Sequence, residues 1–260
     1  MLNGLIAIIK FVLFGIFVSS YILFCYFWRL FNRDNRKRRQ FYVRIIQRYS
    51  KMFMWFLNFE AVIKNKPDMR KHYLYVGNHL GMLDILLVAS QLRCMFVTSY
   101  EMREMPLIGT LAEMGGCLFV ERRNRMNIIN ETNNIREALV QGFNVILFPE
   151  GTSTNGEKVL PFKKTLMTAA ANSGTQIYPF VINYTKVNGE PLTLKWRDHV
   201  CWYGDQGFIG TMWKICSLKS LQAELQFLTP ISVKDEKERT AVAAQAHQQV
   251  SAHFLPINTF

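Results

Sequence analysis

The feature that most constrains the fold is an alternation of short apolar segments with helical segments that begins near residue 73. Short runs rich in β-branched and aromatic residues predict strands, and they lie at residues 73–76, 95–99, 117–121, 145–148, 177–184 and 225–227. Helices are predicted at residues 82–92, 105–114, 126–140, 160–171 and 235–255. Strands that alternate with helices along the chain usually pair with one another in parallel. We therefore expect an α/β fold with a single mixed, mostly parallel sheet flanked by helices.

A hydrophobic stretch precedes this alternation. Residues 11–28 carry no charge, and together with residues 4–9 they are long enough to enter or cross a bilayer. The stretch lacks a basic leading region and an A-x-A cleavage site, so it predicts a retained membrane-anchoring helical segment. A buried core helix is the alternative. Basic residues follow directly, at Arg29, Arg33, Arg36, Lys37, Arg38 and Arg39. The positive-inside rule therefore predicts that the rest of the chain is cytoplasmic.

The next segment mixes basic with aromatic and aliphatic residues. Residues 41–63 show the pattern of a helix in the membrane interface, or of an amphipathic helix packed on a domain, and the two are compatible. Residues 64–71, with Pro67, predict a linker. We therefore expect a hydrophobic anchor with a basic flank at 1–40, an amphipathic interfacial helix and linker at 41–66, and a catalytic domain at 67–260.

The composition points to a membrane surface. The net charge is +12, half of the residues are hydrophobic and Phe occurs 20 times. A basic and apolar chain suits anionic lipid headgroups better than nucleic acid, so no nucleic-acid partner is expected. The five cysteines form no C-x-x-C pair, and the five histidines are scattered. A reducing compartment and no metal site are predicted.

A histidine and an aspartate stand five residues apart, as His79 and Asp84. On one helix they would lie about 140° apart, so they do not form a one-face helical pair. We expect a strand before the turn at residues 77–81 and Asp84 in the first turn of the next helix. An aspartate that fixes one imidazole nitrogen leaves the other to accept a proton, as a general base does. The alternative is a polar turn in which Asn78 bonds its own backbone.

Further polar groups follow other predicted strands. Residues 115–123 end in a basic run where Arg122 can clamp a phosphate, although a solvated charge run is the alternative. Residues 145–156 end a strand in a turn that offers a carboxylate, backbone N–H groups and a hydroxyl, from Glu150, Gly151 and Thr152. An ordinary polar loop would look similar. Lys163 and Lys164 begin a predicted helix and suit an anionic ligand.

In order and spacing, these stretches resemble the boxes of the glycerolipid acyltransferases, in particular the bacterial 1-acyl-glycerol-3-phosphate acyltransferases and their lysophospholipid acyltransferase relatives. The first box is Asn78-His79 with Asp84, an H-x4-D pattern. The second spans residues 116–122, the third 148–152 and the fourth, with its proline, 177–179. The resemblance covers residues 42–254.

This resemblance implies that His79 is the general base and Asp84 its orienting partner. It implies a head-group site formed by Arg122, Glu150, Gly151 and Thr152, which Lys163 and Lys164 can extend. The implied reaction transfers a fatty acyl group from acyl-coenzyme A or acyl carrier protein to the hydroxyl of lysophosphatidic acid, giving phosphatidic acid. It needs no cofactor, because a thiolate is already a good leaving group. The implied location is the cytoplasmic face of the inner membrane.

The sequence departs from the family pattern in the third box. Enzymes acting on lysophosphatidic acid usually carry an arginine where this chain has Ser153, although Lys163, Lys164 or Arg123 can replace that charge. Glu121, where aspartate is frequent, is a conservative change. An acceptor such as a zwitterionic lysophospholipid or a lyso-aminolipid therefore stays an alternative.

Two further alternatives lie outside the acyltransferases. A serine hydrolase would use Ser153, but its surroundings lack the closing glycine of G-x-S-x-G. A non-enzymatic basic binder of membranes or nucleic acid explains the charge and leaves the boxes unexplained.

Overall fold

The computed structural model describes residues 2–121 and 127–258. Its strands form an eight-stranded sheet in the order β1-β8-β6-β2-β5-β3-β4, with β7 paired to β6. Neighbours along this order are parallel except β6 and β8. The predicted mixed, mostly parallel sheet is therefore confirmed. The strands are β1 (Phe59–Lys64), β2 (Leu74–Gly77), β3 (Cys94–Ser99), β4 (Leu118–Val120), β5 (Asn144–Leu147), β6 (Ile177–Val187), β7 (Glu190–Pro191) and β8 (Leu221–Phe227).

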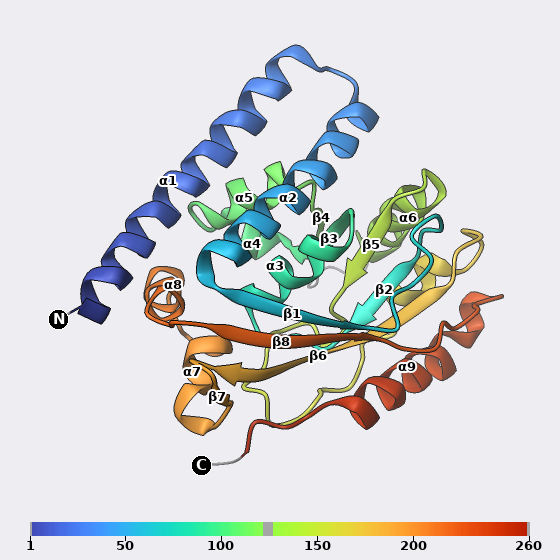
Figure 1. Ribbon diagram of the computed structural model, residues 1–260. Helices are drawn as coiled ribbons and strands as arrows, with labels where there is room; N and C mark the ends of the chain where they lie inside the picture. The colour runs from blue at the N-terminus through green and yellow to red at the C-terminus, as the bar shows by residue number, and fades with distance from the viewer. Residues whose placement is uncertain (1, 122–126, 259–260) are drawn as a thin grey trace.

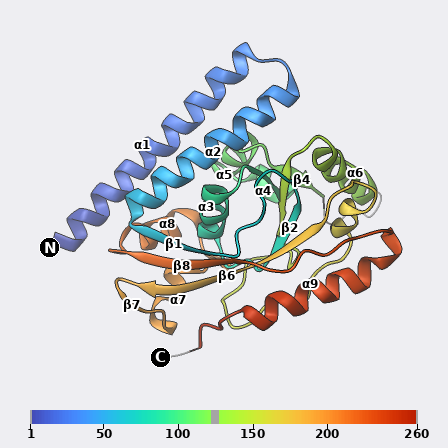
Figure 2. The same cartoon turned by 45° about the vertical axis from the view of Figure 1, so that its right-hand side comes forward.

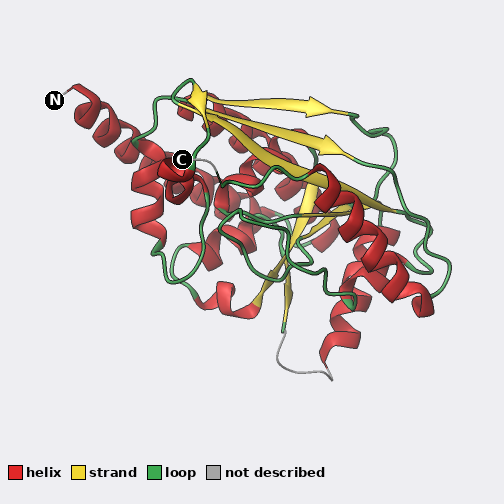
Figure 3. Ribbon diagram, turned by 90° about the horizontal axis from the view of Figure 1, so that it is seen from below, coloured by secondary structure: helices red, strands yellow, loops and turns green. Residues whose placement is uncertain are grey.

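Helices cover both faces of the sheet. Figures 1 and 2 show α1 and α2 as an antiparallel hairpin on one side and α9 on the other, and Figure 3 shows the strands as a twisted layer among the helices. The α-helices are α1 (Leu2–Phe31), α2 (Asn35–Leu57), α3 (Met82–Gln91), α4 (Tyr100–Glu104), α5 (Ile108–Met114), α6 (Asn127–Val140), α7 (Arg197–Val200), α8 (Phe208–Cys216) and α9 (Arg239–His253). Short 3-10 turns lie at Leu166–Ala170, Leu194–Trp196 and Glu236–Glu238.

Alternating residues of the central strands build a core on each face. Tyr75 of β2 packs in one buried cluster with Leu83 of α3, whereas Leu74 of β2 packs in the other with Ile135 of α6 and Ala246 of α9. All of these side chains are fully or almost fully buried. This period-two alternation explains why β2 has a continuous apolar sequence, because both of its faces are covered.

The central strands β2, β3 and β5 run in the same direction, so all of them begin on one side of the sheet and end on the opposite side. Leu74 pairs with Val145 and Val76 with Leu147, so β2 and β5 end at the same level. We call the edge where β2, β3 and β5 end the carboxyl edge, and the opposite edge, where they begin, the amino edge. The loops after β2 and β5 therefore meet at the carboxyl edge, which brings the first and third boxes together.

The helix α1 is packed along much of its length and exposed on its other side. It is the one helix among the described residues that is long and apolar enough to cross a membrane. Phe14 packs on Phe53 and Trp28 stacks on Phe41, both of α2. Lys10, near the other end of α1, donates to the carbonyl of Leu218. Its outer side presents exposed apolar residues such as Leu5, Ile9, Val12, Leu13, Ile16, Leu23, Phe27 and Leu30.

The predicted helix at 41–63 and linker at 64–71 are wrong in part. The helix α2 ends at Leu57, where Asn58 adopts a left-handed conformation and its N–H bonds the last turn. Residues 59–64 then form β1, which pairs in parallel with β8 at the edge of the sheet. A half-exposed edge strand mixes polar and apolar residues much as an amphipathic helix does, so the pattern did not reveal the change.

The predicted helix at 160–171 is also wrong, because only a 3-10 turn forms there, at Leu166–Ala170. The N–H groups of Leu160 and Lys163 bond Glu150 and the carbonyl of Pro149, so this segment is tied to the third box instead. The helix predicted at 235–255 begins at Arg239, after a 3-10 turn. The helical segment between residues 194 and 216 was not predicted.

Candidate active site

His79 and Asp84 meet at the carboxyl edge. His79 lies two residues beyond the end of β2, and Asp84 is in the first turn of α3. The turn between them folds the chain back, and Nδ1 of His79 lies 2.8 Å from Oδ2 of Asp84. The structure therefore brings the dyad together through a strand, a turn and a helix start, as the spacing predicted.

Asp84 is completely buried and receives several hydrogen bonds. Its Oδ2 also accepts the backbone N–H groups of Leu80 and Gly81, at 2.6 and 2.8 Å. Its Oδ1 accepts the hydroxyl of Tyr184 at 2.6 Å. Burial, with Asp84 alongside, raises the pKa of Tyr184 well above its ordinary value, so this hydroxyl keeps its proton. The carboxylate is thus fixed from every side, and it holds the proton of the imidazole on Nδ1.

The imidazole is held as firmly as its partner. Its ring stacks on Phe148, with centroids 4.1 Å apart and planes 10° apart. The backbone N–H of His79 donates to Glu150, and its carbonyl accepts the N–H of Thr154 at 2.9 Å. Its side chain is 20% exposed, and no hydrogen bond to Nε2 comes from residues 2–121 or 127–258. This nitrogen can therefore accept a proton from an incoming hydroxyl.

Asn78 fastens the turn to β6. Its side-chain amide donates to the carbonyl of Ile182 at 2.9 Å, and its oxygen accepts the N–H of Ile182 at 2.8 Å. The alternative in which Asn78 bonds its own backbone is therefore wrong. The strand β2 ends at Gly77. Beyond that point the Asn78 side chain, in place of the β2 backbone, makes the hydrogen bonds to β6.

Glu150, predicted for the head-group site, is buried and occupied by backbone donors. Oε1 accepts the N–H of His79 and Oε2 accepts the N–H of Leu160, both at 2.7 Å. Its residue is only 3% exposed, and this burial raises the pKa of the carboxyl to about 7. In this geometry Glu150 joins the first box to the loop after the third, and neither oxygen turns toward open solvent.

The two lysines predicted for the site point to different places. Gly151 has a φ of +77°, and a Cβ built on it would lie 2.5 Å from Nζ of Lys163, so the lysine side chain lies across this glycine. The positive φ favours glycine here, whereas the lysine side chain is flexible and could move away from a Cβ. Lys164 instead donates to Thr240 at the start of α9, at 3.0 Å. Lys163 therefore lies against the third box, whereas Lys164 is turned toward α9.

The third box is closed by a segment that the sequence reasoning missed. The hydroxyl of Ser153 donates to the carbonyl of Trp202, whose N–H donates to Leu80 at 2.7 Å. A Cβ on Gly81 would lie 2.8 Å from the nitrogen of Trp202. No motif marks Trp202, because its role depends on contacts across the fold. Among the described residues, Ser153 has no hydrogen bond to His79, which gives no support to a serine hydrolase.

The remaining predicted site residues are less well defined. Arg122, together with Arg123, lies outside the described residues. Thr152 is exposed, and its hydroxyl donates to the carbonyl of Ser153 at 3.3 Å. Within the part of the chain that the structure describes, no group of three or more His, Cys, Asp or Glu side chains is placed to hold a metal ion.

Comparisons with known proteins identify the fold and the family of this chain. The family model described as Acyltransferase matches residues 58–183, which contain the dyad and the third box. The solved structure of a 1-acyl-sn-glycerophosphate acyltransferase from Thermotoga maritima has the same fold, with a TM-score of 0.65 at 20% identity, covering 95% of this chain and 93% of that chain.

Two curated relatives are similar over most of their length. A 1-acyl-sn-glycerol-3-phosphate acyltransferase from Neisseria gonorrhoeae is 25% identical and aligns over 72% of this chain and 71% of its own. A lyso-ornithine lipid O-acyltransferase from Brucella abortus is 30% identical over 233 residues, 87% of this chain and 85% of its own. With a relative this similar over most of both sequences, the chain belongs to the acyltransferase family.

Proposed function

We propose that this chain transfers a fatty acyl group from a thioester donor to the free hydroxyl of a lysolipid, with His79 as general base. The observation that carries the proposal is the arrangement of the dyad. Asp84 is buried and fully hydrogen-bonded, it fixes Nδ1 of His79, and Nε2 is left to meet a substrate. Family membership supports the same reaction type.

The chemistry follows from this geometry. Nε2 of His79 takes the proton of the acceptor hydroxyl while the oxygen attacks the thioester carbonyl. The C–O bond forms, the tetrahedral intermediate collapses, and the C–S bond breaks. The thiolate then recovers the proton from the imidazolium, which Asp84 stabilises in the meantime. No protein nucleophile is needed, and burial raises the pKa of Cys117 to about 12, so this box cysteine stays a neutral thiol.

For the acceptor we propose a lyso-aminolipid of the lyso-ornithine type, with lysophosphatidic acid as the second candidate. Sequence reasoning alone placed them in the opposite order. Two observations favour the new order: the relative from Brucella abortus is named for this acceptor, and Ser153 puts a neutral hydroxyl, bonded to Trp202, where a phosphate-binding arginine is expected. Lys163 supplies one positive charge, which suits the single carboxylate of an amino-acid headgroup.

We also propose that the enzyme works at a membrane surface, on the cytoplasmic face of the inner membrane. The apolar outer side of α1 supports this, since exposed apolar area of this extent is otherwise unfavourable in water. Lys10 of α1 bonds Leu218 and Arg29 of α1 pairs with Glu113, both in the catalytic domain, so the helix is suited to lie against the bilayer with the domain beside it. The domain division proposed from sequence then applies with β1 moved into the catalytic domain.

The proposal is tested with purified full-length enzyme, one acyl-coenzyme A and a panel of lysolipids. We expect turnover of lyso-ornithine lipid to exceed turnover of lysophosphatidic acid and of lysophosphatidylcholine. The reverse order would reject the proposed acceptor and keep the reaction. If no lysolipid is acylated with either acyl-coenzyme A or acyl carrier protein as donor, the proposed function itself is rejected.

A further inference from the structure

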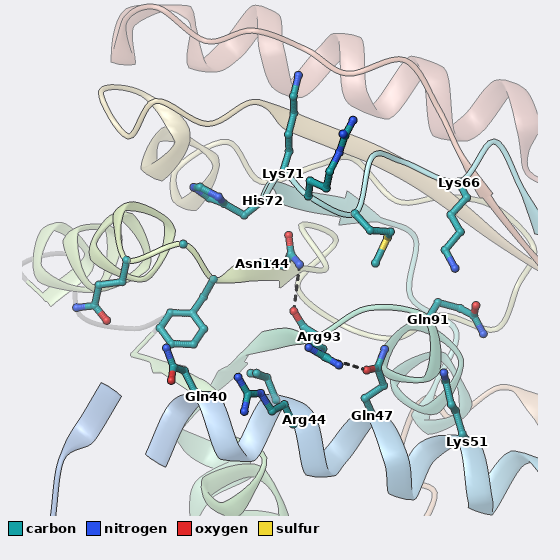
Figure 4. A pocket seen from close by; sticks show the side chains of 16 residues that line it. Gln40, Arg44, Gln47, Lys51, Lys66, Lys71, His72, Gln91, Arg93 and Asn144 are labelled. Atoms are coloured by element: carbon teal, nitrogen blue, oxygen red, sulfur yellow. Dashed lines mark hydrogen bonds between the residues drawn. The ribbon is translucent and has the colours of Figure 1, made fainter. Parts of the chain in front are cut away.

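A second charged region lies far from the dyad, at the amino edge of the sheet. Here a cavity of about 520 Å³ lies between α2 and the residues that lead into β2, β3 and β5. Figure 4 shows side chains from α2 on one side and from the segment before β2 on the other. Cations line both sides: Arg44, Lys51, Lys66, Arg70, Lys71 and Arg93. We call this cavity the basic groove.

Few carboxylates neutralise the positive charge of the basic groove. The residues that line it include no Asp or Glu. Arg70 pairs with the half-buried Asp68, which is not among the lining residues, and Arg93 donates to the neutral Gln47 at 3.2 Å. Cations crowded together repel each other, so such a concave surface attracts an anion from solution or from a membrane.

The basic groove does not include the dyad of His79 and Asp84. The segment that lines it ends at His72, before β2 begins, whereas His79 follows the end of β2. The strand between them has four residues, or about 13 Å of extended chain. On the other side, α2 packs against α3, which carries Asp84. An acyl-coenzyme A bound with its phosphates in the groove would therefore have to pass its thioester through the protein core to reach His79. The groove is thus not suited to bind the acyl donor.

The exposed side of α2 indicates what approaches the groove. Arg44 and Lys51 of the groove share one exposed stripe of the helix with Arg48 and Met52, and Trp55 continues the stripe one turn later. Trp55 is 84% exposed. Cations followed by an exposed indole are typical of a surface at the level of lipid headgroups. The apolar outer side of α1 lies on the same helical hairpin.

We propose that the basic groove binds the phosphate of an anionic phospholipid headgroup and so fixes the enzyme on acidic membranes. Cations on both walls surround one phosphate, while Trp55 and Met52 lie beside the glycerol and upper acyl region. The site is distinct from the acceptor site at the carboxyl edge. Because it excludes His79 and Asp84, its occupancy does not depend on the proposed acyl transfer, and it can be measured without turnover.

The test compares the partition of full-length protein into phosphatidylcholine vesicles with its partition into vesicles that also contain phosphatidylglycerol. The ratio of the two partition coefficients removes the contribution of α1. In the groove variant, Arg44→Gln, Lys51→Gln and Lys71→Gln remove charges whose side chains have no hydrogen-bonded partner among residues 2–121 and 127–258. We expect this ratio to fall by about 100-fold, since each cation near an anionic surface contributes about a factor of five.

The matched control, which we call the turn variant, removes the same charge from the α1–α2 connection and the first turn of α2, through Arg33→Gln, Arg36→Gln and Lys37→Gln. A smaller loss in this turn variant supports the groove, and a loss as large as that of the groove variant overturns it. An unchanged ratio in the groove variant also overturns the proposal. Excess coenzyme A at constant ionic strength gives the last arm. If it abolishes the preference of wild-type protein, the groove binds nucleotide phosphates and the lipid assignment fails.

Discussion

The carboxyl and amino edges of the same sheet use charge in opposite ways. At the carboxyl edge the carboxyl groups of Asp84 and Glu150 are buried, and each has both of its oxygens hydrogen-bonded. At the amino edge the cations that line the basic groove are exposed, and within the described residues only Arg70 forms an ion pair with a carboxylate. Fully hydrogen-bonded groups hold a fixed geometry, which proton transfer needs, whereas exposed cations attract an anionic partner. We therefore propose that chemistry takes place at one edge and membrane recognition at the other.

The largest expected effect on kcat comes from comparing two alanine substitutions, one of a histidine at each edge. His79→Ala removes the proposed base, so we expect kcat to fall by about 10³-fold or more. His72→Ala, which changes the same residue type in the basic groove, leaves kcat essentially unchanged. Both are measured by acyl transfer in detergent micelles. Equal losses in the two variants would show that the edges are not functionally separate.

The second largest effect is expected for Glu150. Because Glu150 accepts the N–H of His79, we propose that it positions the histidine. Glu150→Gln turns one acceptor into a donor that faces a backbone N–H, so we expect kcat to fall by about 10- to 100-fold with KM nearly constant. A rise in KM at constant kcat would instead support the head-group role that the family resemblance implies. Steady-state kinetics with varied lysolipid separates the two.

The raised pKa of Glu150 also predicts how stability depends on pH. The carboxyl has a pKa of about 7 in the fold, above its ordinary value, so its neutral form stabilises the fold at low pH. That contribution is lost as pH rises through 7. Between pH 5 and pH 8 we expect wild-type protein to lose stability of the order of 3 kcal/mol relative to Glu150→Gln. Thermal melting measures this, with the exposed Glu190→Gln as control, and parallel pH curves would contradict it.

The acceptor preference is expected to respond to the third box. Ser153→Arg adds the missing charge, so we expect the ratio of kcat/KM for lysophosphatidic acid over lyso-ornithine lipid to rise by about tenfold. Ser153→Ala serves as control and keeps most activity. If Ser153→Ala abolished turnover, serine would be a nucleophile and direct attack would be wrong.

The smallest expected effect distinguishes two neighbouring lysines. Lys163→Gln removes the cation that lies across Gly151, so we expect KM for the acceptor to rise by about threefold, as for other exposed charges. Lys164→Gln only breaks a bond to Thr240 and leaves KM unchanged. A larger effect from Lys164 would place the headgroup nearer to α9 than the structure indicates.

Much of the carboxyl edge was predictable because its determinants are local. The apolar run of β2, the turn and the first turn of α3 lie within about a dozen residues, and their spacing alone excluded a one-face helical pair. The family resemblance added the third box. The sheet class also followed from local alternation, since buried parallel strands require apolar residues on both faces.

What escaped prediction depends on contacts between distant segments. Tyr184 reaches Asp84 from β6, and Trp202 seals the turn at Gly81 through its backbone, which no sequence pattern records. The segment at 160–171 has helical residues, but its N–H groups are taken by Glu150 and Pro149. The basic groove could not be predicted either, because its cations come from α2, the segment before β2 and the residue before β3.

The central claim is that the two edges act independently, and one paired measurement tests it most directly. Turnover and the preference for phosphatidylglycerol vesicles are measured on the same preparations of His79→Ala and of the groove variant. We predict that His79→Ala loses turnover and keeps the preference, whereas the groove variant loses the preference and keeps turnover in micelles. Loss of both properties in either variant would contradict the account.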